Sequence, residues 1–209
     1  MRNNTKKKKD ILANYIRVNK KEYISLIIIF LIGLIIGVIC VNNAKETQKI
    51  SIIDYINNFI NEIKENSNID RLSLIKSSIQ KNILTALLLW FIGLAVISIP
   101  LVYFIIAFRG MCIGYTITSI VATIGIGKGT IFVICGILLQ NVILIPCMLA
   151  LGVSGIRLYK CIKRKNGNIK SEIFRHSLFS LFILVLIIIA CIIESYISST
   201  LLVQYIKYL

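Results

Sequence analysis

Residues 24–41 read ISLIIIFLIGLIIGVICV, an apolar run of 18 residues that decides the fold class of the chain. At about 1.5 Å per residue, a helix of this length crosses nearly all of a hydrocarbon core about 30 Å thick. Basic residues precede the run, among them the four lysines at 6–9, and it ends in Val41-Asn42-Asn43-Ala44. Because a signal peptide has a shorter apolar region followed by small residues, we interpret this run as a retained membrane anchor.

The composition of the whole chain extends this interpretation beyond one anchor. Hydrophobic residues make up 57% of the 209 positions, more apolar surface than one soluble core of this size can bury. The net charge is +15, but the charges avoid five long apolar stretches and gather between them. A soluble nucleic-acid-binding domain does not separate charge in this way, so we predict no nucleic acid partner and name membrane lipids as the first one.

Four further apolar stretches follow the anchor. We predict an all-α, polytopic integral membrane protein with about five transmembrane or re-entrant helices. Pro100 is expected to kink the long second span, and the third stretch is too short for an untilted crossing. The predicted stretches are Ile83–Phe108, Met111–Ile124, Thr130–Ile156 and Ser177–Ile197.

The basic residues predict the orientation of the chain in the membrane. Placing the N-terminus, Arg109 and the 157–175 loop on one side collects two thirds of the 24 basic residues there. The positive-inside rule then makes the N-terminus cytoplasmic and the C-terminus external. The predicted segments are a basic cytoplasmic segment at 1–22, a first transmembrane helix at 23–41, an extracytoplasmic helical segment at 42–81, and a membrane domain at 82–209 with its basic loop at 157–175.

The segment 42–81 is the one sizeable polar part of the chain. Isoleucine and phenylalanine recur in it at helical spacing, which predicts an amphipathic helix. One account lays this helix on the protein's own outer surface. The other makes its apolar face a docking surface for an extracytoplasmic partner. The docking residues would be Ile56, Phe59, Ile60 and Ile63.

Few polar residues lie inside the apolar stretches, and these are the candidate functional residues. Gln140 and Asn141 lie in the middle of the fourth stretch, where an amide must face protein or water. Midplane amides, a proline and a glycine-interrupted segment also occur at transporter substrate sites, so a transporter or channel for a small molecule or lipid remains the alternative function. The candidate polar membrane residues are Arg109, Gly110, Gln140, Asn141, Pro146 and Glu194.

Few side chains in this sequence could support catalysis or bind a metal ion. The six cysteines form no CxxC pair and fall mostly in apolar stretches, as small apolar side chains do. His176, the single histidine, follows Arg175 at the start of an apolar run, and we interpret it as an anchor at the membrane interface. Glu194 has no histidine or second carboxylate beside it for acid and base chemistry. We therefore predict no enzyme activity and no cofactor.

The second half of the chain resembles stage II sporulation protein M of endospore-forming Firmicutes. The resemblance rests on FRG at 108–110 with Gly114, on the glycine-rich turn at 125–129, on LLQNVILIP at 138–146 and on ESYIS at 194–198. Length and hydropathy agree over nearly the whole chain. Leu139 and Ser199 stand where proline is usual in the family.

This resemblance implies a specific function, which the composition alone does not indicate. It implies a protein of the mother-cell membrane, needed when that cell engulfs the forespore. It also implies that the protein works with the sporulation proteins D and P, which degrade peptidoglycan, by localising or scaffolding them. No catalytic residue is transferred by the resemblance, because the cleavage of the cell wall belongs to those partners.

Overall fold

The computed structural model describes residues 17–65, 71–95, 98–164 and 169–206. The described chain is helical, which confirms the predicted fold class. Its helices, in chain order, are α2 (Lys20–Asn42), α3 (Glu46–Glu65), α4 (Arg71–Leu94), α5 (Ser98–Ile124), α6 (Ile126–Val133), the π-helix η1 (Ile134–Leu138), α7 (Leu139–Arg164) and α8 (Ile169–Ile206).

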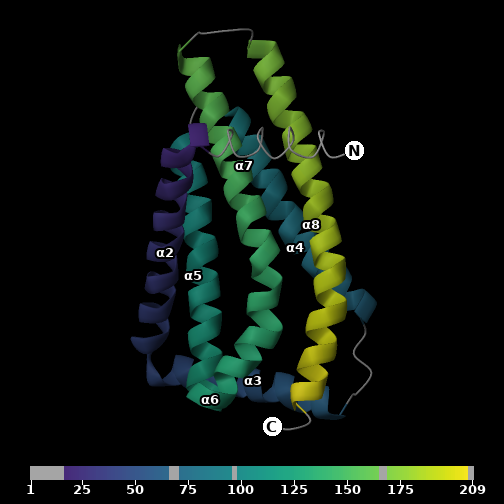
Figure 1. Ribbon diagram of the computed structural model, residues 1–209. Coiled ribbons are helices and arrows are strands. Elements are labelled where there is room, and N and C mark those ends of the chain that lie inside the picture. Colours follow the sequence, from purple (N-terminus) through teal and green to yellow (C-terminus); the bar gives the residue numbers. More distant parts are fainter. Residues whose placement is uncertain (1–16, 66–70, 96–97, 165–168, 207–209) are drawn as a thin grey trace.

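Five of the described helices are long and apolar enough to cross a membrane. They stand roughly along one direction and form the bundle shown in Figure 1, whereas the amphipathic α3 lies across one end of it beside α6. The start of α2 and the end of α8 lie at opposite ends of the bundle. This agrees with the predicted odd number of crossings, while the assignment of one end to the cytoplasm stays a prediction.

The predicted boundary of the second span is wrong. Residues 83–108 do not form one kinked helix, because α4 ends at Leu94 and α5 begins at Ser98. Pro100 lies in the first turn of α5, where the missing N–H of proline costs no hydrogen bond. Proline therefore begins a helix here instead of bending one.

The predicted short third stretch is also corrected. Met111–Ile124 is the second half of α5, which runs unbroken through Arg109 and Gly110 as one full candidate span. The preceding span was predicted to end at Phe108, before Arg109, and a cation inside an apolar helix is costly. In the fold, Arg109 donates a hydrogen bond to Asn82 across the bundle, so the helix continues.

The predicted glycine-rich turn at 125–129 is shorter in the structure, because the chain turns at Gly125 and residues 126–129 already belong to α6. Gly125 separates α5 from α6 and has a φ of 91°, a left-handed conformation that glycine adopts without strain. The chain reverses there and returns through α6, η1 and α7. These helices bring Asn141 to the wall of a cavity that Arg109 of α5 also lines.

Helices α2 and α5 pack side by side through two glycine pairs that sequence periodicity alone did not reveal. Gly33 and Gly37 of α2 lie against the backbone of α5, and Gly110 and Gly114 of α5 lie against the backbone of α2. A Cβ atom at any of the four positions would collide with a carbonyl oxygen of the other helix. This is the small-residue packing that lets membrane helices approach closely, and it gives Gly110 a structural role.

The buried apolar side chains form two clusters. The larger one fills the bundle between the spans and includes Leu26, Leu89, Leu151 and Ile187, each with no exposed surface. The smaller one lies where α3 crosses the end of the bundle. It consists of Ile56, Ile60, Ile63, Ile120, Phe132, Val133 and Ile206.

Candidate functional site

A polar cavity lies between α4, α5 and the junction of η1 with α7. Its volume is about 410 Å³. At its wall, Arg109 donates from Nη2 to Oδ1 of Asn82 over 3.1 Å, and Asn82 is 2% exposed. The Nδ2 of Asn82 donates in turn to the carbonyl of Ser78 over 3.0 Å. These bonds give hydrogen-bond partners to the buried Asn82 and the half-buried Arg109 in apolar surroundings.

Asn141 forms the opposite wall of this cavity. Its Nδ2 donates to the carbonyl of Ile137 over 2.8 Å, and the side chain is 5% exposed. Its Oδ1 has no hydrogen-bond partner among the described residues. Ile137 belongs to η1, and π-helical turns inside α-helices are frequent at functional sites. The wall of the cavity therefore combines a buried amide oxygen, which has no partner among the described residues, with irregular backbone.

The packing of α2 against α5 gives the depth of this cavity in the bundle. Gly33, near the middle of the apolar run at 24–41, lies against the backbone of Ala107, two residues from Arg109. The polar cavity is therefore near the midplane of the spans. Polar and ionisable groups at that depth are expensive and are functional candidates by default.

The structure brings only some of the predicted polar residues together. Arg109 and Asn141 line the same cavity, and Gly110 lies next to it in the contact with α2. Pro146 lies inside α7, about one and a half turns beyond Asn141. The backbone of Gln140 and Glu194 is helical, but their side chains lie outside the described part of the structure.

Of the residues that line this cavity, only Arg109 and Asn141 were predicted, and Lys81 and Asn82 are the most polar of the others. Both were assigned to the boundary of the polar segment at 42–81, where charge and amides are ordinary. The structure places them in α4 within the candidate span Lys76–Leu94. Lys81 and Asn82 follow Ser77 and Ser78 by four residues, so the four polar side chains share one helical face. This spacing could have indicated a polar wall inside the bundle. The indication was weak because Arg109, which faces this wall, had been placed at a membrane interface.

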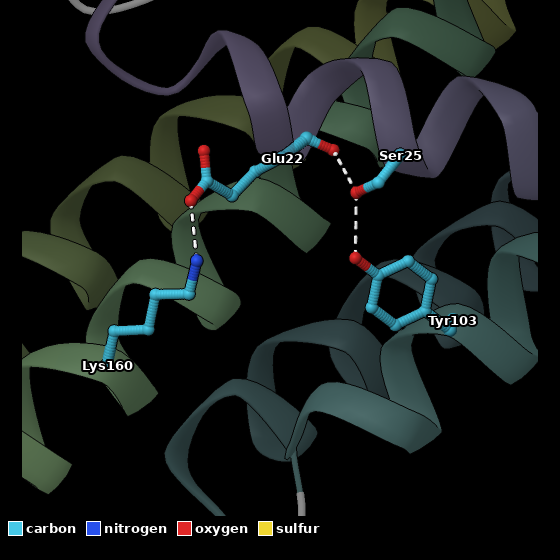
Figure 2. Close-up of polar contacts among 4 residues, drawn as sticks. All are labelled: Glu22, Ser25, Tyr103 and Lys160. Atoms are coloured by element: carbon cyan, nitrogen blue, oxygen red, sulfur yellow. Dashed lines mark hydrogen bonds and ion pairs between the residues drawn. The ribbon is translucent and has the colours of Figure 1, made fainter.

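A second set of polar contacts connects helices near the start of α2 (Figure 2). The hydroxyls of Ser25 in α2 and Tyr103 in α5 lie 2.7 Å apart, and Nζ of Lys160 in α7 lies 2.6 Å from a carboxylate oxygen of Glu22. The contacts link three helices. Because Lys160 is largely exposed, the ion pair contributes little by itself and serves mainly to align the helices.

His176, which was predicted to anchor the chain at the membrane interface, is buried between the helices. The side chain is 3% exposed, and its Nδ1 lies 2.8 Å from the hydroxyl of Ser154 on α7. An added Cβ at Gly93 of α4 would lie 2.7 Å from the ring. The absence of a side chain at Gly93 makes room for the ring in the core, which the sequence alone did not indicate.

The predicted docking face of the amphipathic helix is mostly covered. Ile56, Ile60 and Ile63 are 6–9% exposed because they pack into the smaller apolar cluster, and Phe59 remains 40% exposed. The structure thus has the arrangement of the first account, in which the helix lies on the protein's own surface. Within the described residues, no three His, Cys, Asp or Glu side chains gather as a metal site.

Comparisons with known proteins place the chain in a family. The family model for stage II sporulation protein M matches residues 26–199, which include all five candidate spans or most of each. No curated protein and no solved structure matches. The matched range covers most of the sequence, and the chain is therefore a multi-pass membrane protein that belongs to the stage II sporulation protein M family.

Proposed function

We propose that this protein is a non-enzymatic scaffold that localises the peptidoglycan-degrading machinery in the mother-cell membrane during engulfment of the forespore. The observation that carries the proposal is the family match over residues 26–199. Its partners are then the sporulation proteins D and P, which cut the cell wall. The chain holds them at the membrane and takes no part in the cleavage itself.

The arrangement of α3 supports this proposal. A scaffold must present a surface of fixed orientation to its partners, and α3 is held against the spans by three buried isoleucines. Two isoleucines nearer the start of α3 stay exposed, Ile50 at 56% and Ile53 at 40%. Ile53 precedes Ile56 by three residues, so these exposed side chains continue the apolar stripe beyond its covered part. We assign partner contact to Ile50 and Ile53 instead of the covered isoleucines.

The test is a deletion of the gene in the native spore former, followed by microscopy of engulfment with a membrane dye and affinity capture of the tagged protein. The proposal expects arrested engulfment in the deletion strain and wall hydrolases in the capture. A variant with Ile50→Asp and Ile53→Asp should remain in the membrane and lose the hydrolases, while Lys64→Gln on the same helix should retain them. Normal engulfment without the gene would contradict the proposal.

The polar cavity favours one alternative function, the transport of a small molecule or lipid. Buried amides and an irregular helical turn beside a cavity also occur in transporter substrate sites. Flux of a substrate through proteoliposomes that is lost in Asn141→Leu and kept in the exposed Asn58→Leu would favour transport. Equal leakage of ions and small solutes with and without the protein would favour the scaffold.

A further inference from the structure

The polar cavity between α4, α5 and the junction of η1 with α7 has two basic residues in its wall. These are Lys81 of α4 and Arg109 of α5, and the other described residues of the wall carry no charge. The described wall is therefore positively charged. Its uncharged polar members include Ser77, Ser78, Asn82 and Thr116.

Lys81 brings a charge into the bundle that no described residue neutralises. Its neighbour Asn82 bonds to Arg109, so Lys81 lies at the level of that residue, near the midplane of the spans. An ammonium group at this depth is costly unless an anion or water accompanies it. Among the ion pairs that join two described residues, none involves Lys81. Because Lys81 is exposed and lines the cavity, its charge stands at the cavity mouth.

The cavity extends from this level toward the end of the bundle that carries α3. Along α5, Arg109, Cys112 and Thr116 follow one another by about one turn each in the direction of α6. Along α4, whose course is opposite to that of α5, Ser78 lies one turn from Asn82 in the same direction (Figure 1). With the predicted orientation this end faces the outside, so a solute reaches the cavity from the extracytoplasmic side.

The wall supplies hydrogen-bond donors of the kind that bind oxyanions. A guanidinium has five N–H groups in a planar fork that fits phosphate and carboxylate oxygens, so Arg109 can bond to Asn82 and to a further acceptor. The ammonium of Lys81 offers three donors, and the exposed Ser77 adds a hydroxyl beside it. Bonds from cationic donors to anionic oxygens are stronger than those between neutral groups. The described wall therefore favours an oxyanion over a neutral solute or a cation.

We propose that the polar cavity binds a small oxyanion, a phosphate or carboxylate group, between Lys81 and Arg109. The group belongs either to a free ion or to the head group of an anionic lipid, since both present the same oxygens. The inference goes beyond the sporulation role and does not rest on it. Its tests measure binding to the purified protein, so they succeed or fail independently of engulfment.

Cys112 reports on the charge of the cavity, because it is exposed and lines the wall beside Arg109. Full-length Asn58→Cys in phosphatidylcholine nanodiscs is treated with an anionic sulfonatoethyl or a cationic trimethylammonioethyl methanethiosulfonate. Mass spectrometry then gives the labelling rate at each position. The proposal expects the ratio of anionic to cationic rates to be several-fold higher at Cys112 than at the exposed Asn58→Cys on α3.

Two lysines of α4 provide the matched pair of variants. Lys81→Gln should lower the ratio at Cys112 several-fold, whereas Lys76→Gln, exposed on the same helix and outside the described wall, should leave it nearly unchanged. Equal ratios at Cys112 and Asn58→Cys, or equal effects of the two lysine substitutions, would overturn the proposal. A Cys112 that reacts with neither reagent would overturn the access from water.

Protection of Cys112 tests binding and identifies the source of the oxyanion. Inorganic phosphate, compared with chloride at the same ionic strength, should slow labelling of Cys112 relative to Asn58→Cys when the occupant is a free ion. Nanodiscs that contain phosphatidylglycerol should slow it, with no added effect of phosphate, when the occupant is a lipid head group. Labelling of Cys112 that neither phosphate nor phosphatidylglycerol slows would show that the cavity holds no oxyanion.

Discussion

Asn82 and Arg109 show how single residues determine whether an apolar helix can continue. An arginine near the bilayer midplane is tolerated when its donors find acceptors, and Oδ1 of Asn82 supplies one of these acceptors. Asn82 is itself buried, and its Nδ2 donates to the carbonyl of Ser78. This bond holds the side chain in the position in which its Oδ1 accepts from Arg109. The two residues therefore act together as a polar link between α4 and α5.

Replacing Asn82 with leucine removes that acceptor and keeps the side chain's approximate size. We expect Asn82→Leu to lower the free energy of unfolding in detergent by about 1–3 kcal/mol, the cost of depriving a buried donor of a partner. Gln80→Leu, at an exposed position of the same helix, is the matched control and should change little. Equal effects of the two substitutions would show that the Arg109 contact does not stabilise the bundle.

At the level of helices, the four glycines between α2 and α5 determine how closely these spans approach. Gly33→Ala would place a methyl group against the carbonyl of Ala107 and force the helices apart. We expect a loss of about 1–3 kcal/mol in unfolding free energy, typical of overpacking. Gly127→Ala is the control, since a Cβ there meets nothing within 4 Å. Thermal unfolding of the purified variants would contradict this account if Gly33→Ala were as stable as Gly127→Ala.

The docking of α3 is a second property of a whole helix. Ile60 is 6% exposed in the cluster beneath α3, so Ile60→Ser should weaken the docking by about 2–4 kcal/mol through lost apolar burial. Asn61→Ser, on the exposed side, should have no such effect. Faster cleavage of α3 by an added protease in Ile60→Ser vesicles measures the change, and identical cleavage rates would exclude the observed docking.

For the whole molecule, hydropathy predicted the class and the number of spans, while polar contacts determined their boundaries. The anchor at 24–41 and the turn at Gly125 were predictable because each depends on local sequence. The uninterrupted course of α5 was not predictable, because Arg109 is accommodated by Asn82, 27 positions away. The polar cavity escaped prediction for the same reason.

The orientation of the molecule in the membrane is predicted by its charge distribution. With the N-terminus inside, α3 lies outside and the end of α7 lies inside. In a variant without native cysteines, a membrane-impermeant thiol reagent added to intact cells should label Asn58→Cys and not Lys163→Cys. Labelling of Lys163→Cys alone would show that the orientation is the reverse of the predicted one and that α3 does not face the cell wall.

The most direct test of the central claim is to image fluorescent sporulation protein P in sporulating cells with and without this chain, alongside its hydrolase activity after purification. The scaffold account predicts that protein P collects at the engulfing membrane only when the full chain is present, and that its purified activity is the same from both strains. Normal placement of protein P in cells that lack the chain and fail to engulf would contradict the account, because the chain would then act after its partners were already in position.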